Sequence, residues 1–317
     1  MTALAALVVT FNRRAQLERT VARLLEGPLD RLVVVDNGSE DGSRDWLAAH
    51  PDPRLTVILP PENGGGARGF EIGMRETVAR FDPDWIVLMD DDARPEPGAL
   101  AHFAALDHGA DVVAGAVRYP SGAICDMNRP WINPFWQAGT FLRTAMGGGR
   151  EAFHLGPDAY EGPHLRDIHG ASFVGLFLSR KAIRDGGYPD GRFFIYGDDV
   201  HYTLGLTARG LRSVFAPGLR FEHDCATLGA DRIFRPLWKT YYHHRNLWHV
   251  YRRAAGPVFF GGVMALMLPK WLMKGRTLGP EERRIYRALI RLAIRDAARG
   301  KMDRPHAEIM ARARHIA

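Results

Sequence analysis

Three consecutive carboxylates, Asp90, Asp91 and Asp92, end the apolar stretch that begins at Trp85. Neighbouring like charges repel, so a partly buried cluster of this kind needs a cation or raised pKa values, whereas a solvated turn tolerates it. Residues two apart in an extended chain point the same way, so Asp90 and Asp92 share a face while Asp91 points elsewhere. The triplet therefore has two interpretations, a turn or helix cap and a two-carboxylate cation site.

Further candidate groups for chemistry lie downstream. Oxygen ligands favour Mg²⁺ or Mn²⁺, and His223 would add a nitrogen ligand better suited to Mn²⁺. Asp198 and Asp199 stand at an expected helix start, where aspartate commonly caps the free backbone N–H groups. The same pair could instead supply a general base that takes a proton from a substrate hydroxyl.

A glycine-rich stretch offers a rival function. Gly64, Gly66 and Gly69 match the pattern G-x-G-x-x-G, with Asp90 about 20 residues further on, as in dinucleotide-binding oxidoreductases that use NAD(P). Residues 60–63 separate the expected strand from the first glycine, however, and that fingerprint needs one acid rather than three. A looser role, in which the glycines let the backbone approach a nucleotide, is compatible with either function.

Apolar runs alternate with helical patterns in the first 117 residues, which indicates an α/β fold with a parallel sheet covered by helices. Strands are expected at residues 4–10, 31–36, 55–59, 85–90 and 111–117. Ligands of such sheets bind beyond the carboxyl ends of the strands. Four polar clusters follow strands there, at residues 10–13, 36–39, 63–66 and 90–92. One cleft could collect all four.

The second half of the chain is less regular. Residues 118–170 are rich in Gly, Pro and Trp and are expected to form long loops around the cleft. A strand leading into a short helix is expected within 170–183, and a loop entering a helix that ends at Gly210 within 193–210. Residues 212–224 then supply a strand that ends in His223.

Composition bounds the setting of the protein. A chain of 317 residues can bury a sizeable core. Its two cysteines, Cys125 and Cys225, give neither a disulfide framework nor a zinc-site spacing, so a reducing, cytoplasmic compartment is expected. The apolar start, residues 1–14, lacks a basic region and a cleavage site and is expected to be a strand with its loop. The basic, aromatic residues 235–253 carry no recognised nucleic-acid motif, so no nucleic-acid partner is expected.

Charge is distributed unevenly along the chain. Residues 231–317 hold 19 Lys and Arg against 6 Asp and Glu, a net charge of +13, whereas residues 1–230 carry −7. The apolar run 256–271 is short for a helix that needs about 20 residues to cross a bilayer. A basic, aromatic, amphipathic tail suits an anionic membrane surface, and a helical subdomain with solvated Arg residues is the alternative.

Six segments, in this order, resemble the motif series of the family-2 glycosyltransferases: VVTFNR, VVVDNGSEDGS, NGGGARGF, LMDDDARP, FFIYGDDVHYTLGLTARG and YYHHRNLW. Within that family the chain is most similar to bacterial galactofuranosyl- and rhamnosyltransferases, which share the N-x-G-G-x-x-G-F stretch and the D-D-D triplet. The resemblance implies a GT-A fold with a Rossmann-like, mainly parallel sheet and a C-terminal helical region. Residues 1–117 would bind the nucleotide sugar, 118–230 the acceptor, and 231–317 would form a basic, amphipathic helical region.

The resemblance also implies roles for single residues. Asp90, Asp92 and His223 match the ligands of Mn²⁺ or Mg²⁺, and Asp199 matches the general base. Galactofuranosyltransferases commonly have a Trp directly before the base pair, where this chain has Tyr196 and Gly197. Contacts to the nucleotide sugar are implied for Thr10, Asn12, Arg13, Asp36, Asn63, Gly64, Gly65, Asp91 and Asp198.

The implied activity is a metal-dependent, inverting transfer of a sugar, with galactofuranose or rhamnose favoured. The donor would be a UDP- or dTDP-sugar, and the acceptor a hydroxyl of a cell-surface glycan or a lipid-linked molecule. The enzyme would be cytoplasmic, peripheral on the inner face of the membrane, with oligomers allowed. An NAD(P)-dependent oxidoreductase is the alternative.

Overall fold

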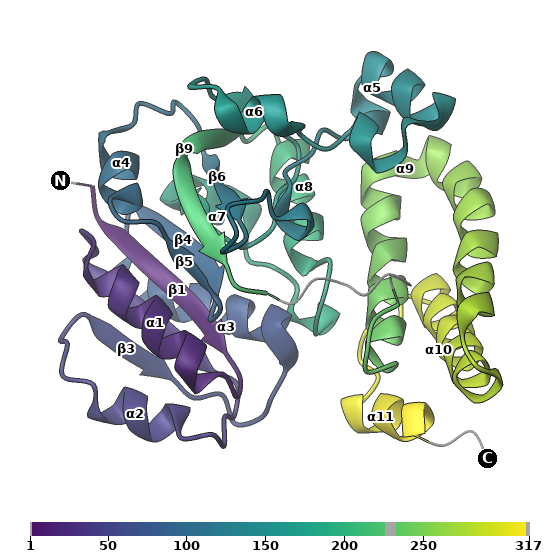
Figure 1. Ribbon diagram of the computed structural model, residues 1–317, viewed down its shortest axis with the longest axis horizontal. Coiled ribbons are helices and arrows are strands. Elements are labelled where there is room, and N and C mark those ends of the chain that lie inside the picture. Colours follow the sequence, from purple (N-terminus) through teal and green to yellow (C-terminus); the bar gives the residue numbers. More distant parts are fainter. Residues whose placement is uncertain (1, 226–232, 315–317) are drawn as a thin grey trace.

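A computed structural model describes residues 2–225 and 233–314 of the chain, so the boundary expected at 230/231 lies outside the described residues. Figure 1 shows an α/β body built on one sheet, with a group of long helices beside it. The group consists of α9 (Lys239–Lys274), α10 (Pro280–Ala298) and α11 (His306–Arg314). The division into three functional parts stays a prediction.

Four parallel strands form the first half of the sheet, in the order β3-β2-β1-β4. They are β1 (Leu4–Thr10), β2 (Arg31–Asp36), β3 (Leu55–Ile58) and β4 (Trp85–Asp90), and the helices between them are α1 (Arg14–Leu25), α2 (Ser43–Ala49) and α3 (Gly65–Phe81). The register pairs Thr10 with Asp36 and Val9 with Asp90. The carboxyl ends of β1, β2 and β4 therefore lie side by side, as the sequence predicts.

The second half makes the sheet mixed. It contains β5 (Ala93–Pro95), α4 (Ala99–Ala105), β6 (Val112–Arg118), β7 (Arg166–Asp167), β8 (Leu176–Ser179), α7 (Arg180–Gly186), α8 (Asp198–Ala208) and β9 (Ser213–His223). β8 runs antiparallel between β4 and β6, while β9 is parallel to β6 and antiparallel to β5. The pairing of β9 with β5 sets His223 opposite Ala93, next to the acidic triplet. β5 was not predicted, because three residues are too few to show the alternation of apolar and polar residues that marks a strand.

The long region between β6 and β8 holds only short elements around loops. These are η1 (Asp126–Asn128), η2 (Pro134–Trp136), α5 (Ala138–Arg143), η3 (Thr144–Gly148), η4 (Gly149–Ala152) and α6 (Pro157–Glu161). Two further turns, η5 (Gly191–Phe193) and η6 (Gly275–Thr277), precede α8 and follow α9. The expectation of loops in this region is met, although short helices interrupt them.

Side chains of β1 alternate between two apolar layers, one on each face of the sheet. Val8 packs with Leu17 of α1, whereas Val9 packs with Phe70 and Met74 of α3. This alternation follows from the period of two in an extended strand. Because both faces are covered, the strands are continuous apolar runs, which made them visible in the sequence.

Helix α9 folds back on itself. Gly256 leaves the helical conformation, with φ 61° and ψ −176°, and Pro257 follows it, so the two segments of α9 form a hairpin (Figure 1). Met264 and Trp271 of the second segment pack against Tyr286 and Ile290 of α10. By length and composition, the stretch Lys239–Thr277 could cross a membrane: its most apolar 18-residue window has a mean hydropathy of 1.3, and 11% of that window is buried. The break at Gly256 divides this stretch.

Candidate active site

The proposed metal ligands come together at the ends of β4 and β9. One ligand atom from each of Asp90, Asp92 and His223 lies within 4.8 Å of the others. His223 Nε2 is 3.1 Å from Asp92 Oδ1, and both side chains are buried. Two carboxylates and one imidazole form the kind of donor set that suits Mn²⁺ or Mg²⁺, so the residues fit such an ion.

Positive charges balance the buried carboxylates of this group. Burial and the charge of Asp92 raise the pKa of Asp90 to about 6. Burial would also raise the pKa of Asp92, but the hydrogen bond and charge of His223, with the charge of Arg13, hold it below its ordinary value. Although burial opposes it, the same hydrogen bond raises the pKa of His223 to about 10. A divalent cation could take over the role of these positive charges.

Asp91 turns away from this group, as expected, but residues 91–92 form a turn between β4 and β5 and not the expected extended stretch. Its Oδ2 accepts hydrogen bonds from Thr10 Oγ1 at 2.7 Å and from the Phe11 N–H at 3.4 Å. Burial raises the pKa of Asp91 to about 7, although the Thr10 hydroxyl acts in the opposite direction. Arg13 forms a short ion pair with Asp92 and lies 3.8 Å from Asp91. Asp91, Thr10 and Arg13 thus fasten the loop after β1 to the triplet.

The loop after β2 carries buried acceptor atoms without a partner. Asp36 Oδ1 accepts from the N–H groups of Gly38 and Ser39, at 2.9 and 2.7 Å. Its Oδ2 has no hydrogen bond within residues 2–225 and 233–314, although Arg44 Nε lies 3.7 Å away. Asn37 Oδ1 likewise has no hydrogen bond to the described residues. Because buried polar atoms are normally satisfied, these two oxygens indicate a place for a ligand.

Asn12 joins the loops that follow β1 and β2. Its backbone N–H donates to Ser39 Oγ at 2.9 Å, and its side-chain oxygen accepts from the Glu40 N–H at 2.7 Å. Asn12 has φ 54°, in the left-handed region that Asn tolerates better than most residues. Asn12 therefore holds the loops after β1 and β2 together through Ser39 and Glu40.

The glycine-rich loop serves close packing. Asn63 Oδ1 accepts from the Gly65 N–H at 2.9 Å, and the Gly64 side-chain position faces Arg68. Gly65 has φ +79°, and a Cβ there would collide with the Phe194 carbonyl oxygen. These contacts bring the start of α3 against the segment before α8.

The position of this loop also weakens the oxidoreductase alternative. A dinucleotide fingerprint occupies the turn after the first strand of the fold. Here the glycines follow β3, at the edge of the sheet, while the turn at residues 11–13 contains no glycine. A Cβ at Gly69 would meet the side chains of Val9 and Asn37, so this glycine permits packing of α3 on the sheet.

Asp198 and Asp199 begin α8, directly after Gly197, which is the N-cap residue with φ 81°. Burial raises the pKa of Asp199 to about 6, although backbone N–H groups, that of Val200 first, oppose the rise. Burial and the charge of Asp199 raise the pKa of Asp198 as well. The charge of Asp199 also raises the pKa of Asp90, so Asp199 lies near the predicted metal ligands.

A clamp from α9 holds the segment that leads into Asp198 and Asp199. Asn246 Nδ2 lies within hydrogen-bond distance of three carbonyl oxygens, those of Phe193, Ile195 and Tyr196, at 2.9, 2.8 and 2.7 Å. Fully buried Arg245 donates from Nη2 to Phe193 O at 3.0 Å. Tyr196 has φ 68°, a strained conformation for a bulky residue. The clamp therefore stabilises the conformation that places the acids.

This clamp was not predicted from the sequence, and neither were two other polar residues near the site, Asn128 and Lys239. Asn128 Oδ1 lies 2.7 Å from His223 Nδ1, where it can accept the ring N–H and leave Nε2 facing Asp92. Burial and the charge of Arg13 lower the pKa of Lys239, so this cation lies near Arg13. No local signal marks such residues, because a buried Arg or Asn in a helix has the same letters as a solvated one. The motif YYHHRNLW contains Arg245 and Asn246 and was the only trace of the clamp in the sequence.

Comparisons with known proteins show what the chain is similar to. The family model described as Glycosyl transferase family 2 matches residues 5–159, which include the triplet but end before Asp199 and His223. Galactofuranosyltransferase GlfT1 of Mycolicibacterium smegmatis is 27% identical over 277 residues, 85% of this chain and 87% of the relative. The N-acetylglucosaminyl-diphospho-decaprenol L-rhamnosyltransferase of Mycobacterium tuberculosis is 27% identical over 257 residues, 72% of this chain and 78% of the relative.

A solved structure shares the fold. The mannosyltransferase PcManGT from Pyrobaculum calidifontis, in complex with GDP-Man and Mn²⁺, superposes with a TM-score of 0.51 at 20% identity. The superposition covers 98% of this chain and 79% of that protein. The likeness confirms the expected α/β architecture with its C-terminal helices, and it gives no support to a dinucleotide-binding oxidoreductase.

Proposed function

The chain belongs to glycosyltransferase family 2, and from this premise we propose that it moves a hexose from a nucleotide diphosphate to an acceptor hydroxyl, with inversion of the anomeric carbon. The names of its relatives favour galactofuranose or rhamnose as the sugar. UDP or dTDP is the carrier that we propose. The same names favour a cell-envelope glycan or a lipid-linked molecule as the acceptor.

The observation that carries the proposal is the meeting of Asp90, Asp92 and His223 within 4.8 Å, close enough to Asp199 for its charge to raise the pKa of Asp90. These three residues would hold Mn²⁺ or Mg²⁺. When bound, the ion would neutralise the charge that develops on the nucleoside diphosphate as it leaves. Arg13 forms an ion pair with Asp92, and Lys239 lies near Arg13, so both cations would help to neutralise this charge.

Asp199 is the proposed general base. A pKa of about 6 leaves its carboxylate mostly ionised at pH 7, yet more basic than an ordinary aspartate. It would take the proton of the acceptor hydroxyl while the oxygen attacks the anomeric carbon. Transfer in a single displacement inverts the configuration and needs no covalent enzyme intermediate.

The nucleoside would bind at the ends of β1 and β2. Asp36 Oδ2 and Asn37 Oδ1 are buried acceptors without a hydrogen bond in the described part of the chain, and they suit the hydroxyl or N–H donors of a ribose or base. Asn12 and Asn63 would keep the surrounding loops in place through their backbone partners.

A ligand screen tests this function. Thermal unfolding would be measured with UDP-, dTDP- and GDP-sugars and with NAD(H), each with and without Mn²⁺. We expect a UDP- or dTDP-sugar to raise the unfolding temperature, and only when Mn²⁺ is present. Stabilisation by NAD(H) that is indifferent to the metal would instead support the oxidoreductase.

We also propose that the enzyme is a peripheral protein of an anionic membrane surface, where a lipid-linked acceptor would lie. An exposed apolar patch supports this proposal: Leu142 and Met146, near α5, are 57% and 72% exposed, and Val258, after the break in α9, is 81% exposed. Phe141 of α5 and Phe259 of α9 join the two parts of the patch, with ring centroids 5.3 Å apart. Figure 1 shows α5 beside the bend of α9. Contiguous exposed apolar surface of this kind commonly marks an interaction site.

Packing and charge favour a helix that lies on the surface. Met264 and Trp271 are buried against α10, so one face of the second α9 segment is committed to the protein. The net charge of +13 on residues 231–317 would attract anionic headgroups, with each nearby Lys or Arg contributing about 1 kcal/mol. Such attraction is screened by salt.

Liposome co-sedimentation tests the membrane proposal, with anionic and neutral vesicles at low and high salt. We expect binding to anionic vesicles that falls at high salt and in the variants Leu142→Asp and Val258→Asp. Leu59→Asp is the matched control, because Leu59 is 55% exposed but follows β3, away from the patch. Equal recovery with both vesicle types would contradict the proposal and favour a soluble acceptor.

A further inference from the structure

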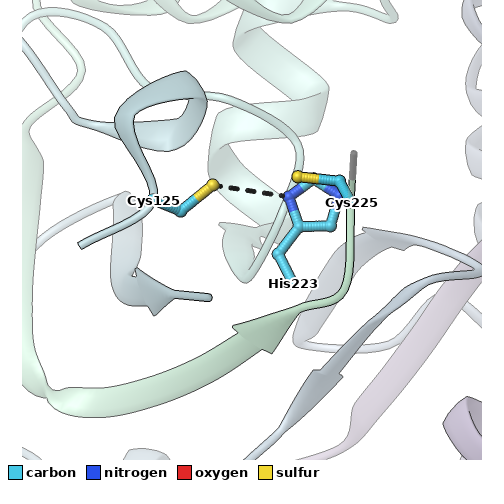
Figure 2. A group of neighbouring side chains, drawn as sticks. All are labelled: Cys125, His223 and Cys225. Carbon is cyan, nitrogen blue, oxygen red and sulfur yellow. Dashed lines mark hydrogen bonds between the residues drawn. The ribbon is translucent and has the colours of Figure 1, made fainter. Parts of the chain in front are cut away.

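The two cysteines lie 100 positions apart in the sequence, yet both side chains reach His223 (Figure 2). Cys125 Sγ, Cys225 Sγ and a ring nitrogen of His223 all lie within 4.8 Å of one another. Cys125 Sγ is 3.8 Å from His223 Nδ1, and Cys125 is fully buried. Two thiols and an imidazole therefore share one small space.

Backbone pairing fixes this arrangement. The Cys125 N–H donates to Val117 O of β6 at 3.0 Å, which holds the cysteine beside the sheet. His223 ends β9, and the Asp224 N–H donates to Asp92 O at 2.9 Å, which continues the strand pairing by one residue. In an extended chain His223 and Cys225 point to the same side. Figure 2 shows the Cys225 sulfur next to the His223 ring, with Cys125 facing both.

The donor set differs in kind from the neighbouring carboxylates. Thiolates and imidazole select soft or borderline cations such as Zn²⁺, whereas oxygen ligands select Mg²⁺ or Mn²⁺. Donors around one tetrahedral Zn²⁺ lie about 3.5 to 4 Å apart, given Zn–S and Zn–N bonds of about 2.3 and 2.0 Å. The observed separations, up to 4.8 Å, need only a small contraction to reach this geometry.

We propose that Cys125, Cys225 and the Nδ1 atom of His223 form a second cation site, for a soft divalent ion such as Zn²⁺. Water or the side-chain oxygen Oδ1 of Asn128, which lies 2.7 Å from Nδ1, would complete the tetrahedral shell of the ion. Each thiol releases its proton to solvent when it binds the ion. The proposal of this cation site depends only on these residues and is independent of the proposed glycosyl transfer.

The shared imidazole couples the two sites, and this second part rests on the proposed function. A neutral imidazole has one lone pair. When a cation binds Nδ1, the proton stays on Nε2, and the Nε2–H group donates to Asp92 at 3.1 Å. When a cation binds Nε2, the proton stays on Nδ1, and the Nδ1–H group donates to Asn128. A soft ion in the cysteine site would therefore withdraw His223 from the carboxylate site and weaken Mn²⁺ binding.

Co²⁺ is the probe for the first part, because thiolate ligation of Co²⁺ produces a charge-transfer absorption that Zn²⁺ displaces. The full chain would be titrated alongside Cys125→Ser, Cys225→Ser and the control Asp90→Asn, with unfolding temperatures recorded for all four. We expect the band at one equivalent in the wild type and in Asp90→Asn, and its loss in both serine variants, with Zn²⁺ affinity reduced about 100-fold. A wild-type chain without the band, or serine variants that keep it, would overturn the site.

The coupling has its own measurement, the electron paramagnetic resonance signal of free Mn²⁺. One equivalent of Zn²⁺ should weaken Mn²⁺ binding about tenfold in the wild type and leave it unchanged in Cys125→Ser. Equal Mn²⁺ affinity with and without Zn²⁺ would overturn the coupling. Absence of Mn²⁺ binding in every variant, with the cobalt band intact, would instead contradict the proposed function.

Discussion

Two aspartates near the predicted metal site, Asp92 and Asp199, have different surroundings, and their pKa values are shifted in opposite directions. Arg13 and His223 lie beside Asp92 and hold its pKa below the ordinary value, although burial acts the other way. Burial raises the pKa of Asp199 to about 6, and backbone N–H groups offset only part of that rise. A carboxylate next to fixed positive charge stays ionised and can hold a cation, whereas a desolvated one exchanges a proton near neutral pH. This difference supports the proposed roles, metal binding for Asp92 and proton transfer for Asp199.

Replacing Asp199 by Asn should have the largest effect. The amide keeps the shape of the side chain but removes its capacity to take a proton, so turnover should fall about 10²- to 10⁴-fold while donor binding is retained. Turnover and Mn²⁺-dependent donor affinity would be measured on the same preparation. Near-normal turnover would leave Asp199 as a residue of the first helical turn only.

Asp92→Asn should give the opposite pattern. Loss of a ligand should weaken Mn²⁺-dependent donor binding by about 10- to 100-fold, and the loss of turnover should be recovered in part at high Mn²⁺. Asp224→Asn is the control, because Asp224 accepts a hydrogen bond from Gln16 at 2.7 Å, outside the ligand group. If both variants bind the donor as the wild type does, the metal assignment is wrong.

Asn246→Ala tests whether the clamp on the loop before Asp199 matters for catalysis. Buried carbonyl oxygens would lose their donor, which should lower the free energy of unfolding by about 1 to 3 kcal/mol. Turnover should fall about tenfold because a small displacement of a catalytic group is costly. Asn133→Ala is the matched control: Asn133 Nδ2 donates to Ala254 O at 2.9 Å, also on α9. The control should lose stability alone, and a similar loss of turnover in both variants would contradict a specific role.

The pH dependence should show the smallest effect. Because the pKa of Asp199 is about 6, the base is protonated and lost as the pH falls through that value. With donor and Mn²⁺ saturating, turnover should be about half its maximum at pH 6 and about a tenth at pH 5. Residual activity of Asp199→Asn should lack this decline. A wild-type rate that stays constant from pH 8 to pH 5 would separate the base from Asp199.

Local patterns in the sequence were enough to predict most of the strands and the position of the acidic triplet. β1, β2 and β4 have the expected bounds, and β3 and β6 differ by one residue, because strands buried on both faces are continuous apolar runs. The triplet lies at the carboxyl end of β4, as the apolar run predicts; Asp90 and Asp92 come together and Asp91 contacts Thr10, although residues 91–92 form a turn and not the expected extended stretch. Both results follow from local geometry, which depends only on neighbouring residues.

Which distant side chains meet depends on the tertiary structure and cannot be predicted from local patterns. Short β5 pairs with β9 and brings His223 to Asp92. The pairing of β9 with β6 brings Cys225 to Cys125, which bonds to β6, although the spacing of the two cysteines showed no sign of a metal site. Buried Asn246 lies in a segment whose composition suggested only a basic, aromatic surface. Contacts of this kind depend on how strands and helices are ordered in space, and no local pattern records that order.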